Sequence, residues 1–277
     1  VIEGLGIGVL GGPVVTGALA GLDAGEREDP RPVAEAIRRG AAGMALPPKA
    51  SVVVDGGGVL HLEGVGADVR VRALGGGDWE VAGVGRFDAA GAAAAALRAL
   101  AGPRARDRGR EAAVPVGRFA LRDGEAVGVG VAFGQMEAVA LAGLAAAVGE
   151  GELRPAAGRG LVALGVEVEA FRTAAERLGF VVDPGDPRLR IVACSGAPAC
   201  ASAHLATREL AAALARRPEL LEGVRVHLSG CAKRCAQPAG ACVSLVAGEG
   251  GNAIEGEAAP AGLRAFLERV PMARVGA

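Results

Sequence analysis

The arrangement of the cysteines constrains this chain more than any other feature of its sequence. Four of the five cysteines form two close pairs, Cys194 with Cys200 in a C-x5-C spacing and Cys231 with Cys235 in a C-x3-C spacing. Pairs of thiols carried by two separate segments are typical of a metal site, because each pair supplies neighbouring ligands. We therefore expect the rest of the chain to serve as the scaffold of this site.

Local sequence patterns place each cysteine pair at the end of a strand. Apolar runs at residues 189–193 and 224–228 predict strands, and a helix is predicted from about residue 201 to residue 217. Each pair then lies where a strand gives way to a loop, among small residues that let backbone N–H groups approach the sulfur atoms. These small residues are Ser195, Gly196, Ala197, Ala199 and Ala232.

Several kinds of cysteine chemistry compete for this pattern. A [4Fe–4S] cluster needs one sulfur ligand for each iron, so two pairs satisfy it, and we favour this interpretation. Zinc sites prefer shorter spacings within a pair, but zinc stays open, with His204 as a spare ligand. Disulfides fit less well, because nothing else in the sequence indicates an oxidising compartment. Scattered buried thiols are the commoner fate of cysteine, but chance rarely places them in two such pairs. The fifth cysteine, Cys242, borders an apolar strand and is interpreted as a buried thiol.

The composition indicates a folded protein without nucleic acid or a membrane as its partner. The chain has 277 residues, of which 51% are hydrophobic, enough to bury a substantial core. A net charge of −1 and the lack of a basic tail argue against nucleic acid. The most apolar window, residues 126–148, is interrupted by Gln135 and Glu137, so no membrane span is predicted. No signal peptide is recognisable, and we predict a cytoplasmic location.

Outside the cysteine region the patterns predict a mixture of strands and helices. A hairpin is expected at residues 51–62, with the turn Asp55-Gly56-Gly57-Gly58 between its strands, followed by a half-exposed strand at residues 67–73. Residues 102–110 are interpreted as a solvated linker. Helices are predicted at residues 32–39, 88–100, 136–148, 168–178 and 260–269, and further strands at residues 127–132, 160–166 and 243–246.

The sequence around the second cysteine pair resembles the sequences of a known family. The segment His227-Leu-Ser-Gly-Cys231-Ala-Lys-Arg-Cys235-Ala-Gln-Pro238, together with the first pair, resembles the sulfite and nitrite reductase haemoprotein superfamily. Its Ser-Gly-Cys-Ala-Lys core is similar to the precorrin-3B synthase branch, whereas assimilatory reductases more often carry Thr-Gly-Cys-Pro-Asn. In siroheme members the last cysteine also bridges the cluster to the haem iron, a position that Cys235 would inherit.

The resemblance implies an α+β fold of the sulfite and nitrite reductase type, with a ferredoxin-like half-domain and two α/β haemoprotein-type units. Family members usually begin with a further N-terminal segment, which we expect this chain to lack. The predicted division is an apolar and helical remnant at residues 1–45, the first α/β unit at 46–101, a linker at 102–112, the ferredoxin-like half-domain at 113–167 and the cluster-binding α/β unit at 168–277.

A bound tetrapyrrole, which the resemblance also implies, would need basic side chains to neutralise its carboxylates. Lys49 follows Leu46-Pro-Pro, where relatives carry a lysine close to the anionic groups of the cofactor. Arg154 and Arg159 fall where relatives have an arginine-bearing strand that faces the tetrapyrrole, although exposure to solvent is the usual fate of arginine. Lys233 and Arg234, inside the second cysteine pair, complete the set of candidates.

The function that the resemblance implies is that of an iron–sulfur oxidoreductase in aerobic cobalamin biosynthesis. It would convert precorrin-3A to precorrin-3B with dioxygen, by ring hydroxylation and lactone formation, using an NAD(P)H-linked or ferredoxin-type electron donor. The resemblance also allows siroheme or a further non-haem iron as a cofactor, and the sequence identifies no catalytic residue. Two alternatives stay open: a siroheme-dependent sulfite or nitrite reductase, and a truncated cluster-binding module that transfers electrons.

Overall fold

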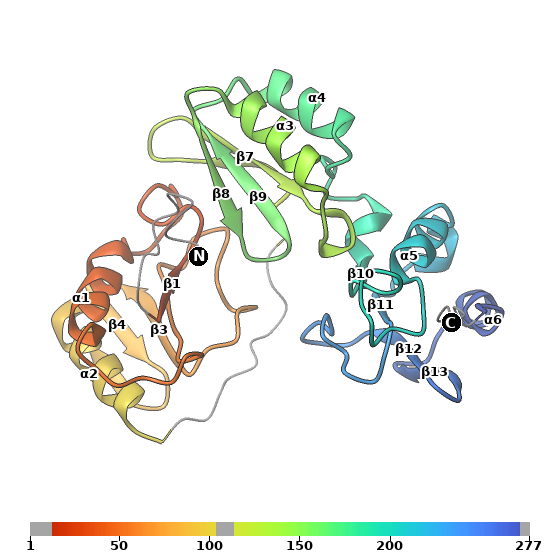
Figure 1. Ribbon diagram of the computed structural model, residues 1–277. Coiled ribbons are helices and arrows are strands. Elements are labelled where there is room, and N and C mark those ends of the chain that lie inside the picture. Colours follow the sequence, from red (N-terminus) through yellow and green to blue (C-terminus); the bar gives the residue numbers. More distant parts are fainter. Residues whose placement is uncertain (1–12, 104–113, 272–277) are drawn as a thin grey trace. The chain divides into compact units, whose positions relative to one another are not determined.

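The computed structural model describes residues 13–103 and 114–271. The chain divides into two compact units, which we call the N-terminal unit (Val1–Ala113 with Phe119–Glu125) and the C-terminal unit (Val114–Arg118 with Ala126–Ala277). The described residues form three sheets flanked by helices (Figure 1). Most of the linker predicted at residues 102–110, from residue 104 onward, lies outside the described residues.

The N-terminal unit is a five-stranded sheet with two helices packed against it. Its strands lie in chain order across the sheet, the first three parallel and the last two antiparallel. The shared core includes Ile37, Val54, Trp79 and Leu100. The elements are β1 (Val14–Thr16), α1 (Arg31–Ala41), β2 (Val52–Asp55), β3 (Val69–Gly75), β4 (Asp78–Val81), β5 (Gly85–Phe87) and α2 (Ala89–Ala101).

The hairpin expected at residues 51–62 is wrong. Strand β2 lies between β1 and β3 and runs parallel to both, so it has no antiparallel partner directly after it. Asp55 at the end of β2 accepts hydrogen bonds from the backbone N–H groups of Gly57 (2.9 Å) and Leu62 (2.7 Å). These two bonds hold the following residues as a loop. The apolar residues at 59–62 had led us to predict a strand there.

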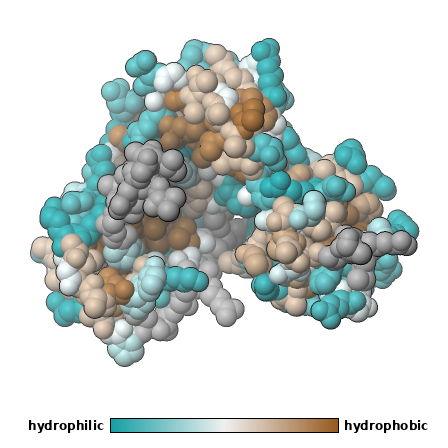
Figure 2. All heavy atoms as spheres, in the orientation of Figure 1, coloured by the Kyte–Doolittle hydropathy of each residue, from teal (hydrophilic) through white to brown (hydrophobic). Residues whose placement is uncertain are grey.

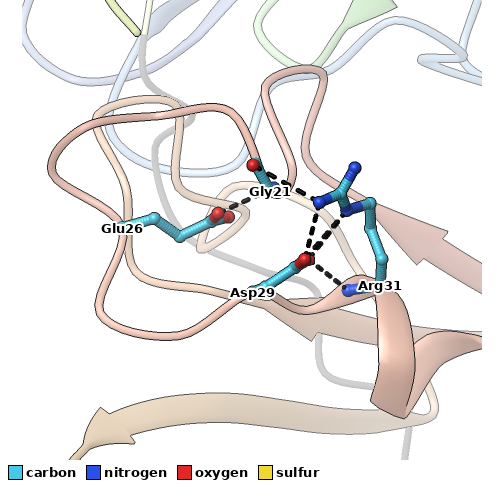
Figure 3. A network of polar contacts seen from close by, with 4 residues as sticks. All are labelled: Gly21, Glu26, Asp29 and Arg31. Atoms are coloured by element: carbon cyan, nitrogen blue, oxygen red, sulfur yellow. Dashed lines mark hydrogen bonds and ion pairs between the residues drawn. The ribbon is translucent and has the colours of Figure 1, made fainter. Parts of the chain in front are cut away.

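A polar network closes the connection from β1 to α1 (Figure 3). Glu26 accepts the backbone N–H of Gly21 at 2.7 Å, and Arg31 pairs with Asp29 at 2.7 Å while donating to the Gly21 carbonyl at 3.4 Å. Gly21 adopts a left-handed φ of 73°, which favours glycine. Burial raises the pKa of the Glu26 carboxyl group to about 7. We therefore expect the charge of Glu26, which accepts the Gly21 N–H, to change near neutral pH.

An antiparallel sheet in the strand order β6-β7-β9-β8 lies mostly in the C-terminal unit, with two helices that share its core. The helices predicted at residues 136–148 and 168–178 are confirmed, and Gly179, with a φ of 86°, follows the second one. The elements are β6 (Gly117–Ala120), β7 (Glu125–Gly130), the short 3-10 turn η2 (Ala132–Gly134), α3 (Ala138–Val148), β8 (Glu152–Ala156), β9 (Gly160–Leu164) and α4 (Val168–Arg177).

A second sheet of the C-terminal unit carries the cysteines. Strands β10, β11 and β12 are parallel, and β13 adds to β12 in the antiparallel sense. The elements are η3 (Pro187–Arg190), β10 (Ile191–Ala193), α5 (Thr207–Ala215), η4 (Pro218–Leu221), β11 (Val226–Ser229), β12 (Val243–Gly248), β13 (Gly251–Gly256) and α6 (Ala261–Glu268). The first four strands of the N-terminal unit have the same connectivity and directions, so the two α/β sheets repeat one topology.

The helix predicted to start near residue 201 begins only at Thr207. The backbone N–H groups of the preceding residues make other hydrogen bonds than those of a helix. That of Ala203 bonds to the Cys200 carbonyl at 3.0 Å, and that of His204 bonds to the Gly230 carbonyl at 2.7 Å. The alanine-rich composition favours a helix here, but contacts with a distant loop override this local preference.

Helix α3 has apolar residues all round and leaves part of them at the surface. Val139 is 82% exposed, and Met136 and Leu141 are exposed nearby. In the view of Figure 2, brown apolar side chains lie on the part of the surface near α3. Within residues 13–103 and 114–271, no helix combines the length and the apolar character needed to cross a bilayer.

Candidate metal centre

The two cysteine pairs lie at the same edge of the β10–β13 sheet. Cys194 directly follows β10, and Cys231 follows β11 after Gly230. Because β10 and β11 are parallel neighbours, their carboxyl ends meet at one edge and bring the two loops together. The prediction that each pair follows a strand is confirmed, and each strand starts two residues later than expected.

Gly230 is the point at which the two cysteine loops touch. Its backbone N–H donates to the sulfur of Cys194 at 3.1 Å, and its carbonyl accepts the His204 N–H at 2.7 Å. A Cβ atom at this position would lie 2.7 Å from the Cβ of Ala203 and 3.4 Å from the Cys194 sulfur. Only glycine lets the loops approach this closely.

Further polar contacts fix both loops. Thr207 donates its hydroxyl to the Cys194 carbonyl at 2.7 Å, and the Ser229 hydroxyl donates to the Cys231 carbonyl at 2.8 Å. Lys233 reaches across to the Ser202 hydroxyl at 3.1 Å and thus joins the second loop to the first. None of these three bonds uses a cysteine thiol, so the thiols stay available as ligands.

The thiols differ in exposure. Cys194, Cys200 and Cys231 are half-buried, and Cys235 is exposed. In the part of the chain that the structure describes, no three cysteine, histidine or acidic side chains are gathered closely enough to form a metal-binding group. The fold thus brings the two loops together without closing the four sulfur atoms around one point. The donor set itself suits a cluster, since a thiolate that accepts a backbone N–H bond is typical of iron–sulfur ligation.

The five basic residues proposed to bind a tetrapyrrole lie in three places. Lys49 is exposed in a turn before β2, in the N-terminal unit. Arg154 on β8 pairs with Glu152 at 2.6 Å. Lys233 and Arg234 belong to the second cysteine loop, where Arg234 pairs with Glu255 of β13. A tetrapyrrole-binding role for these residues stays a prediction.

Arg159 makes contacts that its sequence did not indicate. It lies in the turn between β8 and β9 with a left-handed φ of 66°, and it is half-buried. Its guanidinium donates to the carbonyls of Leu189 and Ile191, both at 2.9 Å. Burial lowers the pKa of the Arg159 guanidinium. In this structure the side chain therefore binds the strand that leads to Cys194.

Sequence patterns did not predict a buried polar row that runs from β11 to β12. Nδ1 of His227 lies 3.2 Å from the Ser244 hydroxyl, which lies 3.5 Å from the sulfur of Cys242. Burial, and secondly the positive charge of Arg234, lowers the pKa of His227 to about 4. The alternation of apolar and polar residues in β11 is the signal that could have revealed it. Cys242 is buried, as predicted.

The chain is similar to known proteins in sequence and in structure. No family model matches the chain. A precorrin-3B synthase from Sinorhizobium sp is 35% identical over 298 aligned residues, which cover 88% of this chain and 64% of that protein. The solved structure of the Mycobacterium tuberculosis NirA protein has a TM-score of 0.61 at 22% sequence identity, with 87% of this chain and 59% of that chain covered. The chain thus spans less than two thirds of the length of each of these proteins.

The likeness to NirA confirms the predicted fold class. The chain is an α+β protein with the sulfite and nitrite reductase type of fold. The sequence comparison is more specific: over 88% of its length the chain is similar to a precorrin-3B synthase, the branch that its cysteine motifs resemble.

Proposed function

We propose that this chain acts as an iron–sulfur oxidoreductase in the conversion of precorrin-3A to precorrin-3B. The observation that carries the proposal is the contact of the two cysteine loops at Gly230, in a chain 35% identical to a precorrin-3B synthase. Cys194, Cys200, Cys231 and Cys235 would hold a [4Fe–4S] cluster, which supplies one-electron transfer when bound. Gly230 then contributes the N–H group that bonds to the Cys194 sulfur.

The electron balance of the reaction requires a reductant. One oxygen atom of dioxygen enters the macrocycle, the other leaves as water, and two electrons and two protons are consumed. An NAD(P)H-linked or ferredoxin-type partner is the proposed source of electrons. The substrate carries many carboxylates, and Lys49, Arg154, Arg159, Lys233 and Arg234 are the proposed basic groups for binding them.

The cluster is tested by replacing each cysteine in turn with serine and reconstituting the protein anaerobically with iron and sulfide. Wild-type protein should take up about four irons per chain, the content of one cluster. Each variant of the quartet should lose most of this iron, while Cys242→Ser serves as the matched control and should keep it. Full iron uptake by the Cys194→Ser and Cys231→Ser variants would contradict the ligand assignment.

The reaction is tested with precorrin-3A, a reductant and isotope-labelled dioxygen. The product should be heavier by one labelled oxygen atom and should contain a lactone. Reduction of sulfite or nitrite by the same preparation, without turnover of the tetrapyrrole, would favour the siroheme reductase instead. Electron transfer without either reaction would favour the simpler cluster-binding module.

A further inference from the structure

The outer edge of β10 is covered by side chains from another part of the C-terminal unit. The backbone N–H of Cys194 bonds to the Leu228 carbonyl of β11 at 3.1 Å. Because successive residues of a strand point to opposite sides, the carbonyls of Ile191 and Ala193 face away from β11. Arg159 binds the Ile191 carbonyl at 2.9 Å, and Gln135 donates to the Ala193 carbonyl at 3.3 Å.

Gln135 also contacts the chain on the far side of the first cysteine pair. Its side-chain oxygen accepts a hydrogen bond from Arg208, in the first turn of α5. Arg208 additionally pairs with Glu137 at 3.2 Å. One glutamine thus binds the residue before Cys194 and a residue shortly after Cys200. Gln135 and Glu137, which follow η2, therefore contact both ends of the loop that carries the first cysteine pair, at Ala193 and at Arg208.

The backbone around these side chains is unusual. Arg159 and Phe133 both adopt a left-handed φ, of 66° and 59°, which side chains other than glycine rarely do. The N–H of Val131 bonds to the Arg159 carbonyl at 2.8 Å, so the turn between β8 and β9 is tied to η2. Such strain persists only where the surroundings fix the conformation, and it concentrates at functional sites.

Arg159 is also a costly residue to bury for structural reasons alone. Within residues 13–103 and 114–271, no carboxylate lies within ion-pair distance of it, and its guanidinium donates to two backbone carbonyls. A desolvated cation without a counter-charge opposes folding. Its rigid, forked donors nevertheless suit two carbonyls on one strand edge, a geometry that lysine cannot reproduce.

We propose that Arg159 and Gln135 are positioning residues for the first cysteine pair. They hold the outer edge of β10 and the start of α5, and so set where Cys194 stands relative to Gly230. We call these contacts of Arg159 and Gln135 the clamp. The hairpin formed by β8 and β9, which also carries Arg154, is thereby joined to the first cysteine loop. For electron transfer, this inference rests on the proposed cluster; for the position of Cys194, it can be tested without one.

The first test uses metal-free protein and follows hydrogen exchange of the Gly230 amide by NMR. This amide donates to the Cys194 sulfur, so its protection reports whether Cys194 is in place. Arg159→Lys keeps the charge but not the fork, and Gln135→Glu removes the donor to Ala193 while keeping an acceptor for Arg208. The double variant should exchange about tenfold faster or more, the factor expected from losing these hydrogen bonds.

Arg190→Lys is the matched control. Arg190 also donates to a backbone carbonyl, that of Leu221 at 2.7 Å, and it adjoins β10 without taking part in the clamp. Its variant should leave Gly230 exchange unchanged within about twofold, since the lost bond lies elsewhere. An equal acceleration in all variants would indicate general loosening of the sheet and would overturn the proposal.

The second test uses reconstituted protein and measures the midpoint potential and the electron paramagnetic resonance spectrum of the reduced cluster. Both should change in the Arg159→Lys and Gln135→Glu variants and stay constant in Arg190→Lys, at matched iron content. If wild-type protein binds no cluster, the proposed function fails, while the exchange measurement still decides the positioning role. If the cluster forms and neither readout responds to the clamp variants, only the present inference fails.

Discussion

Replacement of Gly230 by alanine is the most direct perturbation of the contact between the two cysteine loops. The added carbon would stand 2.7 Å from the Cβ of Ala203, whereas carbon atoms normally pack at about 3.5–4.0 Å. The loops must therefore separate by roughly 1 Å, which weakens the bonds from Gly230 to Cys194 and from His204 to Gly230. Overpacking of this kind costs about 1–3 kcal/mol.

For a unit of this size, such a loss lowers the melting temperature by roughly 2–10 °C, measurable by calorimetry or circular dichroism. Iron uptake on reconstitution should fall in parallel, because Cys194 loses its fixed position beside the second loop. Gly250→Ala is the matched control: Gly250 lies in the turn between β12 and β13, and an added Cβ there meets no atom within 4 Å. A Gly230→Ala protein with wild-type melting and iron content would refute the reasoning.

Three further predictions concern charge and surface. Since burial raises the pKa of Glu26 to about 7, the contribution of this carboxyl group to stability falls as pH rises from 4.5 through 7. Denaturant titrations should show it as a stability difference between wild type and Glu26→Gln, which keeps an acceptor for Gly21, that shrinks over this pH range. The depressed pKa of His227, about 4, acts in the opposite direction: in metal-free protein its contribution falls as pH falls from 6.5 to 4, and the difference between wild type and His227→Gln should shrink over that range. Val139→Lys, at a position 82% exposed, should leave the melting temperature unchanged and raise solubility in precipitation assays.

Sequence patterns predicted those elements whose signals are local. The helix at Ala89–Ala101 begins after Asp88, whose side chain accepts the Gly91 N–H at 2.7 Å, and its alanine-rich run needs no distant partner. The residues after β2 were misjudged, because the hydrogen bonds of Asp55 to Gly57 and Leu62 outweigh their apolar character. The late start of α5 has the same origin, since the His204 N–H is taken by Gly230.

The candidate site shows the same division between local and distant information. The cysteine spacing and the preceding apolar runs were enough to predict two loops at the ends of strands. The clamp on β10 was beyond reach, because Arg159 and Ile191 are 32 residues apart and meet only through the packing of two sheets. Arginine-bearing turns are common, and nothing in the sequence separates one that binds a strand edge from one that faces solvent.

The central claim is that these two loops hold a [4Fe–4S] cluster while the tetrapyrrole is a substrate. The ultraviolet–visible spectrum of anaerobically purified protein tests it most directly. A broad brown absorption without haem bands, bleached by a reductant, is the predicted result. Sharp siroheme bands would contradict the account by making the tetrapyrrole a resident cofactor, and a colourless protein containing zinc would contradict the cluster itself.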